Sequence, residues 1–129
     1  MNSFKLVQHN VKSSSFNENK EKEKKKDIEV GVEGSVLIPK DIQRTKYLIV
    51  QLKLNFGKPD ERFYLTLETV STFEIEKDNT SKEISEEEVR AKCFPVALAE
   101  LRKTVKKVTE AYGLPTVDLP PFEEEIENE

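Results

Sequence analysis

Three segments of this chain alternate apolar and polar residues with a period of two, which is typical of β-strands with one buried face. The apolar positions of residues 28–38 are Ile28, Val30, Val32, Val36 and Ile38. Those of residues 46–56 are Leu48, Val50, Leu52, Leu54 and Phe56. Those of residues 62–76 are Phe63, Leu65, Leu67, Phe73 and Ile75, with Thr69 and Ser71 in the middle of the same face. We therefore predict three strands with buried faces.

A weaker pattern precedes these segments, and a turn connects two of them. Phe4, Leu6 and Phe16 are the apolar residues of a polar stretch, so residues 4–16 are predicted to form an edge strand. Gly57-Lys58-Pro59-Asp60 is a turn sequence, and it would join the strands over 46–56 and 62–76 as an antiparallel hairpin. Residues 17–27 contain no apolar side chain and predict a charged, solvated loop.

The C-terminal part changes to a helical period. Ser85 and Glu88 form a capping box, which predicts a short helix to about Lys92. Pro95 should end it and begin a second, long helix to about Tyr112, with Gly113 as its left-handed cap. The apolar seam of this long helix has spacings of three and four, and its members are Leu98, Leu101, Val105, Val108 and Tyr112.

The order of elements predicts an α+β fold, in which a four-stranded antiparallel sheet packs on a long C-terminal helix that a short helix precedes. A single domain is expected over residues 1–122, with the charged loop at 17–27 inside it. The Glu-rich residues 123–129 are expected to be a flexible acidic tail.

Composition narrows the function. The net charge of −4 argues against nucleic acid as a partner. No apolar stretch has the length of a membrane span, and no signal-peptide pattern opens the sequence, so a cytoplasmic protein is expected. The one cysteine, Cys93, cannot form an internal disulfide, and the one histidine, His9, has no partner at metal-ligand spacing. No phosphate-binding glycine motif is present, so we expect neither enzyme, nor cofactor, nor metal.

Two C-terminal motifs carry a resemblance. Residues 94–102 begin with Phe94-Pro95 at the start of the long helix, and residues 113–122 read Gly-Leu-Pro-Thr-Val-Asp-Leu-Pro-Pro-Phe. This combination resembles the SecB family of export chaperones, whose long helix begins at Phe-Pro and is followed by a Gly-x-Pro crossover segment. The resemblance extends over about residues 4–122.

The resemblance implies a homo-oligomeric chaperone, a dimer or a dimer of dimers, that holds non-native polypeptides without ATP. Export-type members of the family dock the translocation motor SecA through acidic residues on the outer sheet face. The positions that align with them here, Ser13, Asn17 and Thr66, are not acidic, so the resemblance gives little support for SecA binding or for a role in export. Export-type members also have a second C-terminal helix, which is not expected here because the residues after Phe122 are too few and too charged.

The resemblance also implies site residues. The client groove would be lined by Tyr47, Ile49, Leu114, Val117, Leu119 and Phe122. The oligomer contact would be made by Leu98, Leu101, Val105 and Val108, with the first strand. Three alternatives stay open. The crossover residues could simply pack on their own domain, the protein could shield a single antitoxin, or it could be an oligomeric interaction domain that binds no client.

Overall fold

Four antiparallel strands and a helix make up the described part of the chain. The computed structural model describes residues 3–23, 28–37, 46–76 and 85–114. The strands are β1 (Ser3–Glu18), β2 (Val30–Leu37), β3 (Tyr47–Gly57) and β4 (Phe63–Glu76), and α1 (Glu86–Ala111) is the helix. They form one sheet in the order β1-β4-β3-β2, so β1 and β2 are its edges. The predicted α+β class and the edge position of the first strand are confirmed.

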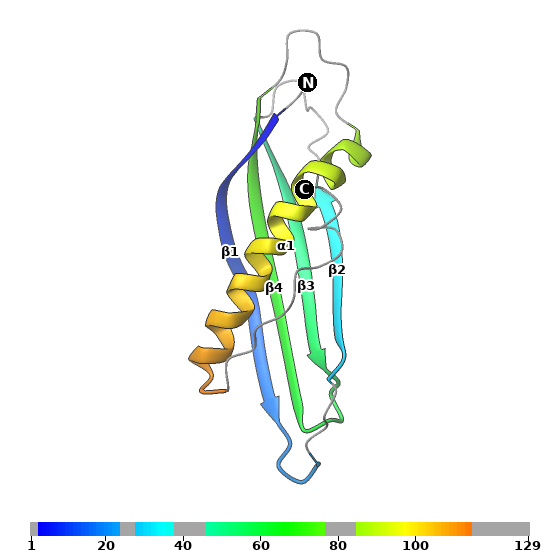
Figure 1. Ribbon diagram of the computed structural model, residues 1–129, viewed down its shortest axis with the longest axis vertical. Coiled ribbons are helices and arrows are strands. Elements are labelled where there is room, and N and C mark those ends of the chain that lie inside the picture. Colours follow the sequence, from blue (N-terminus) through cyan, green and yellow to red (C-terminus); the bar gives the residue numbers. More distant parts are fainter. Residues whose placement is uncertain (1–2, 24–27, 38–45, 77–84, 115–129) are drawn as a thin grey trace.

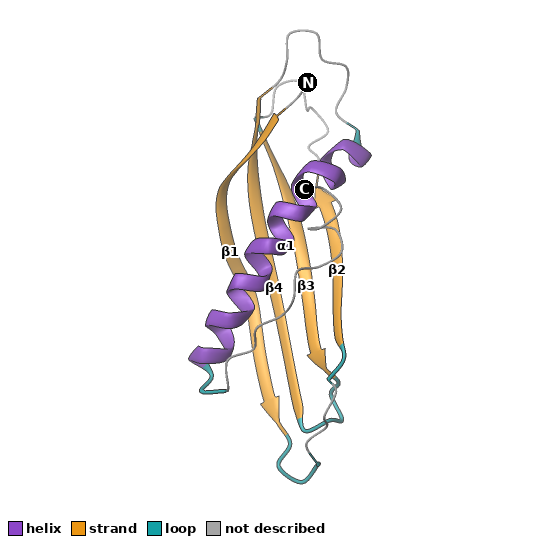
Figure 2. Ribbon diagram, in the orientation of Figure 1, coloured by secondary structure: helices purple, strands orange, loops and turns teal. Residues whose placement is uncertain are grey.

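The molecule has two layers, because α1 covers one face of the sheet (Figure 2). We call this the inner face and the opposite one the outer face. The helix crosses the strands diagonally, from the upper end of β2 to the lower end of β1 in Figure 1. Contacts at both ends agree with this path. The Phe94 ring lies over Gly34 of β2, and the Tyr112 ring lies 5.4 Å from that of Phe16 in β1.

The core lies between α1 and the inner face. The alternating apolar residues of β3 and β4 form its sheet side. The edge strands add partly buried residues, which are Phe4, Leu6, Val32 and Val36. Each fully buried aliphatic side chain contributes about 1.5–3 kcal/mol before its entropy loss is subtracted. The buried residues of the helix are Val89, Cys93, Phe94, Ala97, Leu98, Leu101, Val105 and Thr109.

The predicted short helix before the long one is wrong, because α1 runs unbroken through Pro95. Proline removes one backbone hydrogen bond from a helix interior. Here the residues on both sides of it, Val89 and Cys93 before and Ala97 after, are fully buried against the same sheet. The packing of one continuous apolar face therefore outweighs the lost hydrogen bond, which a local sequence signal does not reveal.

Both ends of α1 have the predicted caps. The Ser85 hydroxyl accepts a hydrogen bond from the backbone N–H of Glu88, at 3.1 Å. Gly113 has a φ of +77°, and the backbone N–H of Leu114 donates to the carbonyl oxygen of Thr109. These bonds satisfy backbone groups that the helix itself leaves without partners.

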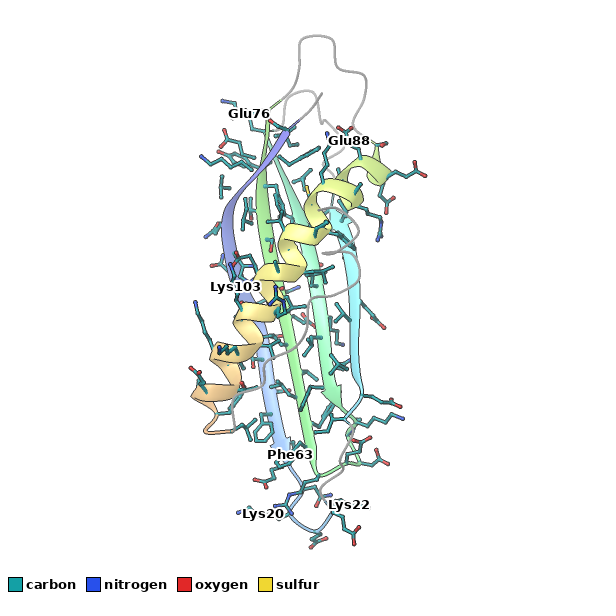
Figure 3. All side chains as sticks on the ribbon, viewed as in Figure 1. Lys20, Lys22, Phe63, Glu76, Glu88 and Lys103 are labelled. Atoms are coloured by element: carbon teal, nitrogen blue, oxygen red, sulfur yellow. The ribbon has the colours of Figure 1, made fainter. Side chains whose placement is uncertain are left out.

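The turn after β1 begins two residues later than the predicted loop, because β1 continues to Glu18. Arg62 fixes this end of the sheet: its guanidinium lies 2.8 Å from the Glu18 carboxylate and also donates to the carbonyl oxygens of Lys20 and Lys22. Figure 3 shows Lys20 and Lys22 at the tip beyond Phe63. Ile38 and residues 24–27 and 115–129, which include the expected acidic tail, lie outside the described residues.

Candidate functional site

The outer face of the sheet is the surface that α1 leaves uncovered. On β2 and β3, four directly opposed pairs point to this face, and along the strands they are Leu37–Ile49, Ser35–Gln51, Glu33–Lys53 and Gly31–Asn55. The chemistry of the pairs therefore changes in order, from apolar through uncharged polar to charged, and ends at a glycine. An antiparallel sheet with one solvated face is usually polar there throughout.

Leu37, Tyr47 and Ile49 form what we call the apolar patch. Leu37 is 51% exposed and Tyr47 is 47% exposed. Leu37 and Ile49 are cross-strand partners, and Tyr47 lies two residues from Ile49 on the same strand face. Sequence reasoning selected Tyr47 and Ile49 but missed Leu37. The sequence did contain a signal for it, because Leu37 is an apolar residue outside the alternating buried positions of its strand.

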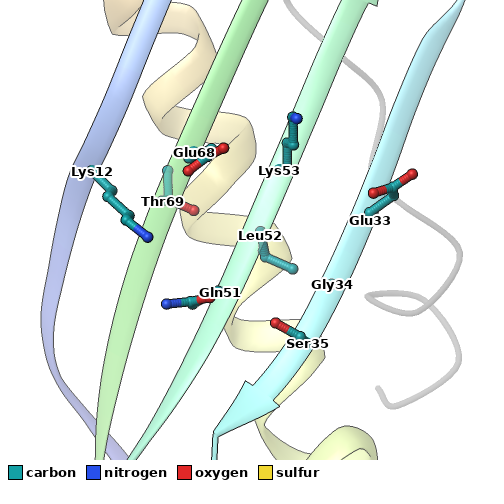
Figure 4. A pocket seen from close by; sticks show the side chains of 9 residues that line it. All are labelled: Lys12, Glu33, Gly34, Ser35, Gln51, Leu52, Lys53, Glu68 and Thr69. Atoms are coloured by element: carbon teal, nitrogen blue, oxygen red, sulfur yellow. The ribbon is translucent and has the colours of Figure 1, made fainter.

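A shallow depression of about 370 Å³ lies in the outer face of the sheet (Figure 4). It adjoins the apolar patch, because its Ser35–Gln51 pair is the next outward-facing pair after Leu37–Ile49. Its charged side chains come from all four strands in alternating sign, and in strand order they are Lys12, Glu68, Lys53 and Glu33. Ser35 and Gln51 line the side nearer the patch. The mixed charge gives this depression no excess of either sign.

A second hollow, of about 260 Å³, lies where the outer face meets the β3–β4 turn. Gly31, Asn55 and Tyr64 line it, and a Cβ atom added at Gly31 would meet nothing within 4 Å. Lys58 and Glu29 stand at its side and form an exposed ion pair of 3.4 Å. The space above Gly31 can therefore receive a side chain from a neighbouring molecule.

The two edge strands differ in regularity. Strand β1 has register shifts between Leu6 and Gln8 and between Val11 and Ser13. Strand β2 pairs with β3 without a shift over its whole length, and its residues carry one charged side chain, Glu33. Bulges and lysines protect edges against pairing with another chain. Strand β2 has neither, and no other described strand pairs with its outer edge, so among the described edges it is the better template for an added strand.

The remaining residues selected from the sequence do not join this surface. Leu114 follows the C-terminal end of α1, beside the lower end of β1, whereas Tyr47 pairs with Glu74 at the other end of the sheet. Leu114 and the apolar patch are therefore not brought together. Val117, Leu119 and Phe122 lie outside the described residues.

The helix seam that was assigned to an oligomer contact lies in the core instead. Leu98, Leu101 and Val105 are at most 3% exposed, and Val108 packs partly buried against the same cluster. Their own sheet covers these side chains. A contact between copies would have to use the outward surface of α1, on which Lys103 projects (Figure 3), or a strand edge.

His9 and Cys93 are the titratable groups between α1 and the sheet that have shifted pKa values. The His9 ring lies 2.8 Å from the Ser71 hydroxyl and 3.0 Å from that of Thr104, which in turn donates to the carbonyl oxygen of Glu100. Burial lowers the pKa of His9, while the nearby Glu100 carboxylate opposes this change. Burial raises the pKa of Cys93 to about 12, which leaves its thiol protonated and unreactive.

The described residues also bring together no metal ligands. No group of three or more histidine, cysteine, aspartate or glutamate side chains in this part of the chain is arranged to hold an ion. Among the same residues, no helix has the length and apolar character that crossing a membrane requires.

Comparison with solved structures identifies the architecture. The chain superposes on a SecB-like chaperone from Mycobacterium tuberculosis, solved in complex with a peptide from the HigA1 antitoxin, with a TM-score of 0.68. The two share 14% identity, over 92% of this chain and 89% of that one.

The fold is SecB-like.

A protein of unknown function from Streptococcus agalactiae is also similar, with a TM-score of 0.53 and 18% identity, over 93% of this chain and 98% of that chain. No protein-family model and no curated protein sequence matches the chain. Ser13, Asn17 and Thr66, the positions for which the sequence resemblance raised the question of SecA docking, lie in the outward-facing register between β1 and β4. They supply no carboxylate to the outer face.

Proposed function

We propose that this protein is an ATP-independent chaperone that holds extended, non-native polypeptide on the outer edge of its sheet. The apolar patch beside the regular edge of β2, which pairs with no described strand beyond β3, is the observation that carries the proposal. A non-native chain offers unpaired backbone groups and apolar side chains, and an open strand edge next to apolar side chains can bind both. The SecB-like fold supports this function, because one similar structure is a chaperone with a bound peptide.

A dedicated client is the second candidate, and it is favoured by the antitoxin peptide in that structure. The outer-face positions without carboxylates argue in the same direction, since they weaken the case for SecA docking and for a general role in export. A dedicated chaperone would protect one partner at stoichiometric ratio and leave unrelated clients to aggregate.

The test is suppression of aggregation of a chemically denatured client, followed by light scattering after dilution. We expect the wild-type protein to suppress it and Tyr47→Ser to weaken the effect. Tyr112→Ser is the matched control, because it makes the same chemical change at a tyrosine that is 40% exposed at the far end of α1, away from the apolar patch. The proposal is contradicted if both variants lose the same amount of aggregation suppression. It is also contradicted if the wild type, at stoichiometric excess, suppresses aggregation of neither a general client nor an antitoxin.

A further inference from the structure

The two halves of α1 are held on the sheet by different contacts. Up to Leu101 the buried residues of the helix are all apolar, whereas beyond it they are Val105 and the polar Thr109. Val11, on the part of β1 that this second half covers, is still 45% exposed. We call residues 102–111 the C-terminal half of α1. Because little apolar surface is buried there, side-chain hydrogen bonds to the sheet matter more for holding it in place.

Hydrogen bonds in series join β4, β1 and the helix through His9. The Thr104 hydroxyl donates to the backbone carbonyl oxygen of Glu100 at 2.8 Å, so its own oxygen accepts from the Nε2–H of His9, 3.0 Å away. A neutral imidazole carries one proton, so Nδ1 is an acceptor, and the Ser71 hydroxyl donates to it at 2.8 Å. This relay therefore has one direction, from Ser71 through His9 to α1, and it requires an uncharged ring.

Protonation of His9 interrupts the relay. With a proton on both ring nitrogens, Nδ1 can no longer accept a hydrogen bond from the Ser71 hydroxyl. Ser71 is 0% exposed, so its hydroxyl is shielded from solvent, and a buried donor that loses its acceptor is unfavourable. The charged ring therefore fits poorly between the helix and the sheet.

The other surroundings of the ring also disfavour its charged form on balance. Burial is the largest effect on the pKa of His9 and lowers it. Of the charged groups on α1 that face the ring, the Glu100 carboxylate raises this pKa and the Lys107 ammonium lowers it. The inner-facing neighbours of His9 on β1 and β4 carry no charge, and they are Leu6, Val11, Thr69, Ser71 and Phe73.

We propose that His9, Ser71 and Thr104 form a pH-sensitive clasp, which releases the C-terminal half of α1 from β1 when mild acid protonates the ring. Release uncovers apolar side chains of both elements, Val11 on the strand and Val105 on the helix. The half of α1 before Leu101 stays in place, because apolar packing has no group that titrates.

A second contact ties the end of α1 to β1 and provides an internal control. The Ser14 and Tyr112 hydroxyls lie 2.9 Å apart, and the Tyr112 ring lies 5.4 Å from that of Phe16. None of these groups gains a proton in mild acid. Weakening this tie should therefore loosen the same half of the helix at every pH alike.

The experiment compares amide hydrogen exchange of the two halves of α1 in the full chain at about pH 7.5 and about pH 5, corrected for the intrinsic pH dependence of exchange. For the wild type we expect the protection of the C-terminal half to fall by about threefold or more relative to the other half, because opening returns the ring to its ordinary pKa. His9→Gln has no titrating ring and should abolish this difference. Ser14→Ala is the matched control, and it should lower protection of the C-terminal half equally at both pH values and leave the difference intact.

Glu100→Gln tests the clasp from the helix side and keeps the relay, which ends on the backbone carbonyl oxygen of that residue. The Glu100 carboxylate raises the pKa of His9, so its removal should move the opening to lower pH. The proposal is overturned if the pH-dependent loss of protection persists in His9→Gln, if Glu100→Gln leaves the opening pH unchanged, or if both halves of the wild-type helix lose protection together. If His9→Gln does not fold, the shift in Glu100→Gln decides alone.

Discussion

Thr69 offers the sharpest test of the packing described above. Its side chain is 1% exposed on the inner face, and its hydroxyl oxygen is buried with no hydrogen-bond partner among the described residues. A buried hydroxyl that lost its water and found no replacement costs about 1–3 kcal/mol. Thr69→Val keeps the shape and removes the hydroxyl, so we expect it to stabilise the protein by about 1–2 kcal/mol. For a chain of this size that raises Tm by about 4 °C for each kcal/mol.

The matched control is Thr109→Val in α1. Thr109 is also fully buried, but its hydroxyl donates to the carbonyl oxygens of Val105 and Lys106, each at 3.0 Å. The same substitution there removes hydrogen bonds, and we expect a loss of about 1 kcal/mol. In urea denaturation, Thr69→Val should raise the midpoint concentration and Thr109→Val should lower it, while the m-value stays the same in both. If Thr69→Val destabilises the protein as much as Thr109→Val does, the Thr69 hydroxyl is bonded and the reasoning is refuted.

Three further predictions concern backbone and pH. Gly57→Ala should lower the free energy of unfolding, measured by urea denaturation, by about 2–3 kcal/mol, because φ is +81° and the new Cβ would collide with the Phe63 carbonyl oxygen. Gly113→Ala is the control. Its φ is +77°, but the space around it is open, so the loss should be about 1 kcal/mol. Pro95→Ala should stabilise the protein by about 1–3 kcal/mol by restoring a helical hydrogen bond; a loss of stability would mean that the proline ring's packing matters more. The pKa of His9 is lowered from 6.5 on folding, so its contribution to stability is complete above pH 6.5 and is lost as the pH falls toward its folded pKa. NMR titration of the ring measures the folded pKa, and denaturation from about pH 7.5 to about pH 5 measures how the free energy of unfolding depends on pH. If His9→Gln leaves that pH dependence unchanged, the prediction is contradicted.

The strands could be predicted because the alternation that determines them lies within each strand's own sequence. Alternation placed Leu48 and Val50 inward and Tyr47 and Ile49 outward, and the observed register agrees. The continuous helix was not predictable, because the packing that carries it through Pro95 joins residues far apart in sequence. The place of Leu37 in the site depends on the same kind of information, since only the register between β2 and β3 brings it opposite Ile49.

The separation of Leu114 from Tyr47 shows a second limit of sequence reasoning. Both are apolar residues outside the buried alternation, so a pattern treats them alike. The sheet places Tyr47 on its outer face at one end, and the helix delivers Leu114 to the other end on the inner side. A groove that combines them would have to extend around an edge, whereas the apolar patch and β2 lie together.

A second copy of the chain is the competing occupant of the β2 edge. Antiparallel pairing of β2 with itself must match outer-facing residues, and the register centred on Glu33 would place two like charges opposite each other, which is unfavourable. The register centred on Gly34 avoids this but places Leu37 beside Gly31, which gives the leucine no apolar partner. We predict that copies associate through β1 and the outward surface of α1, so that peptide affinity is constant over the concentrations at which light scattering shows association. Affinity that weakens as copies associate would assign β2 to the contact between copies.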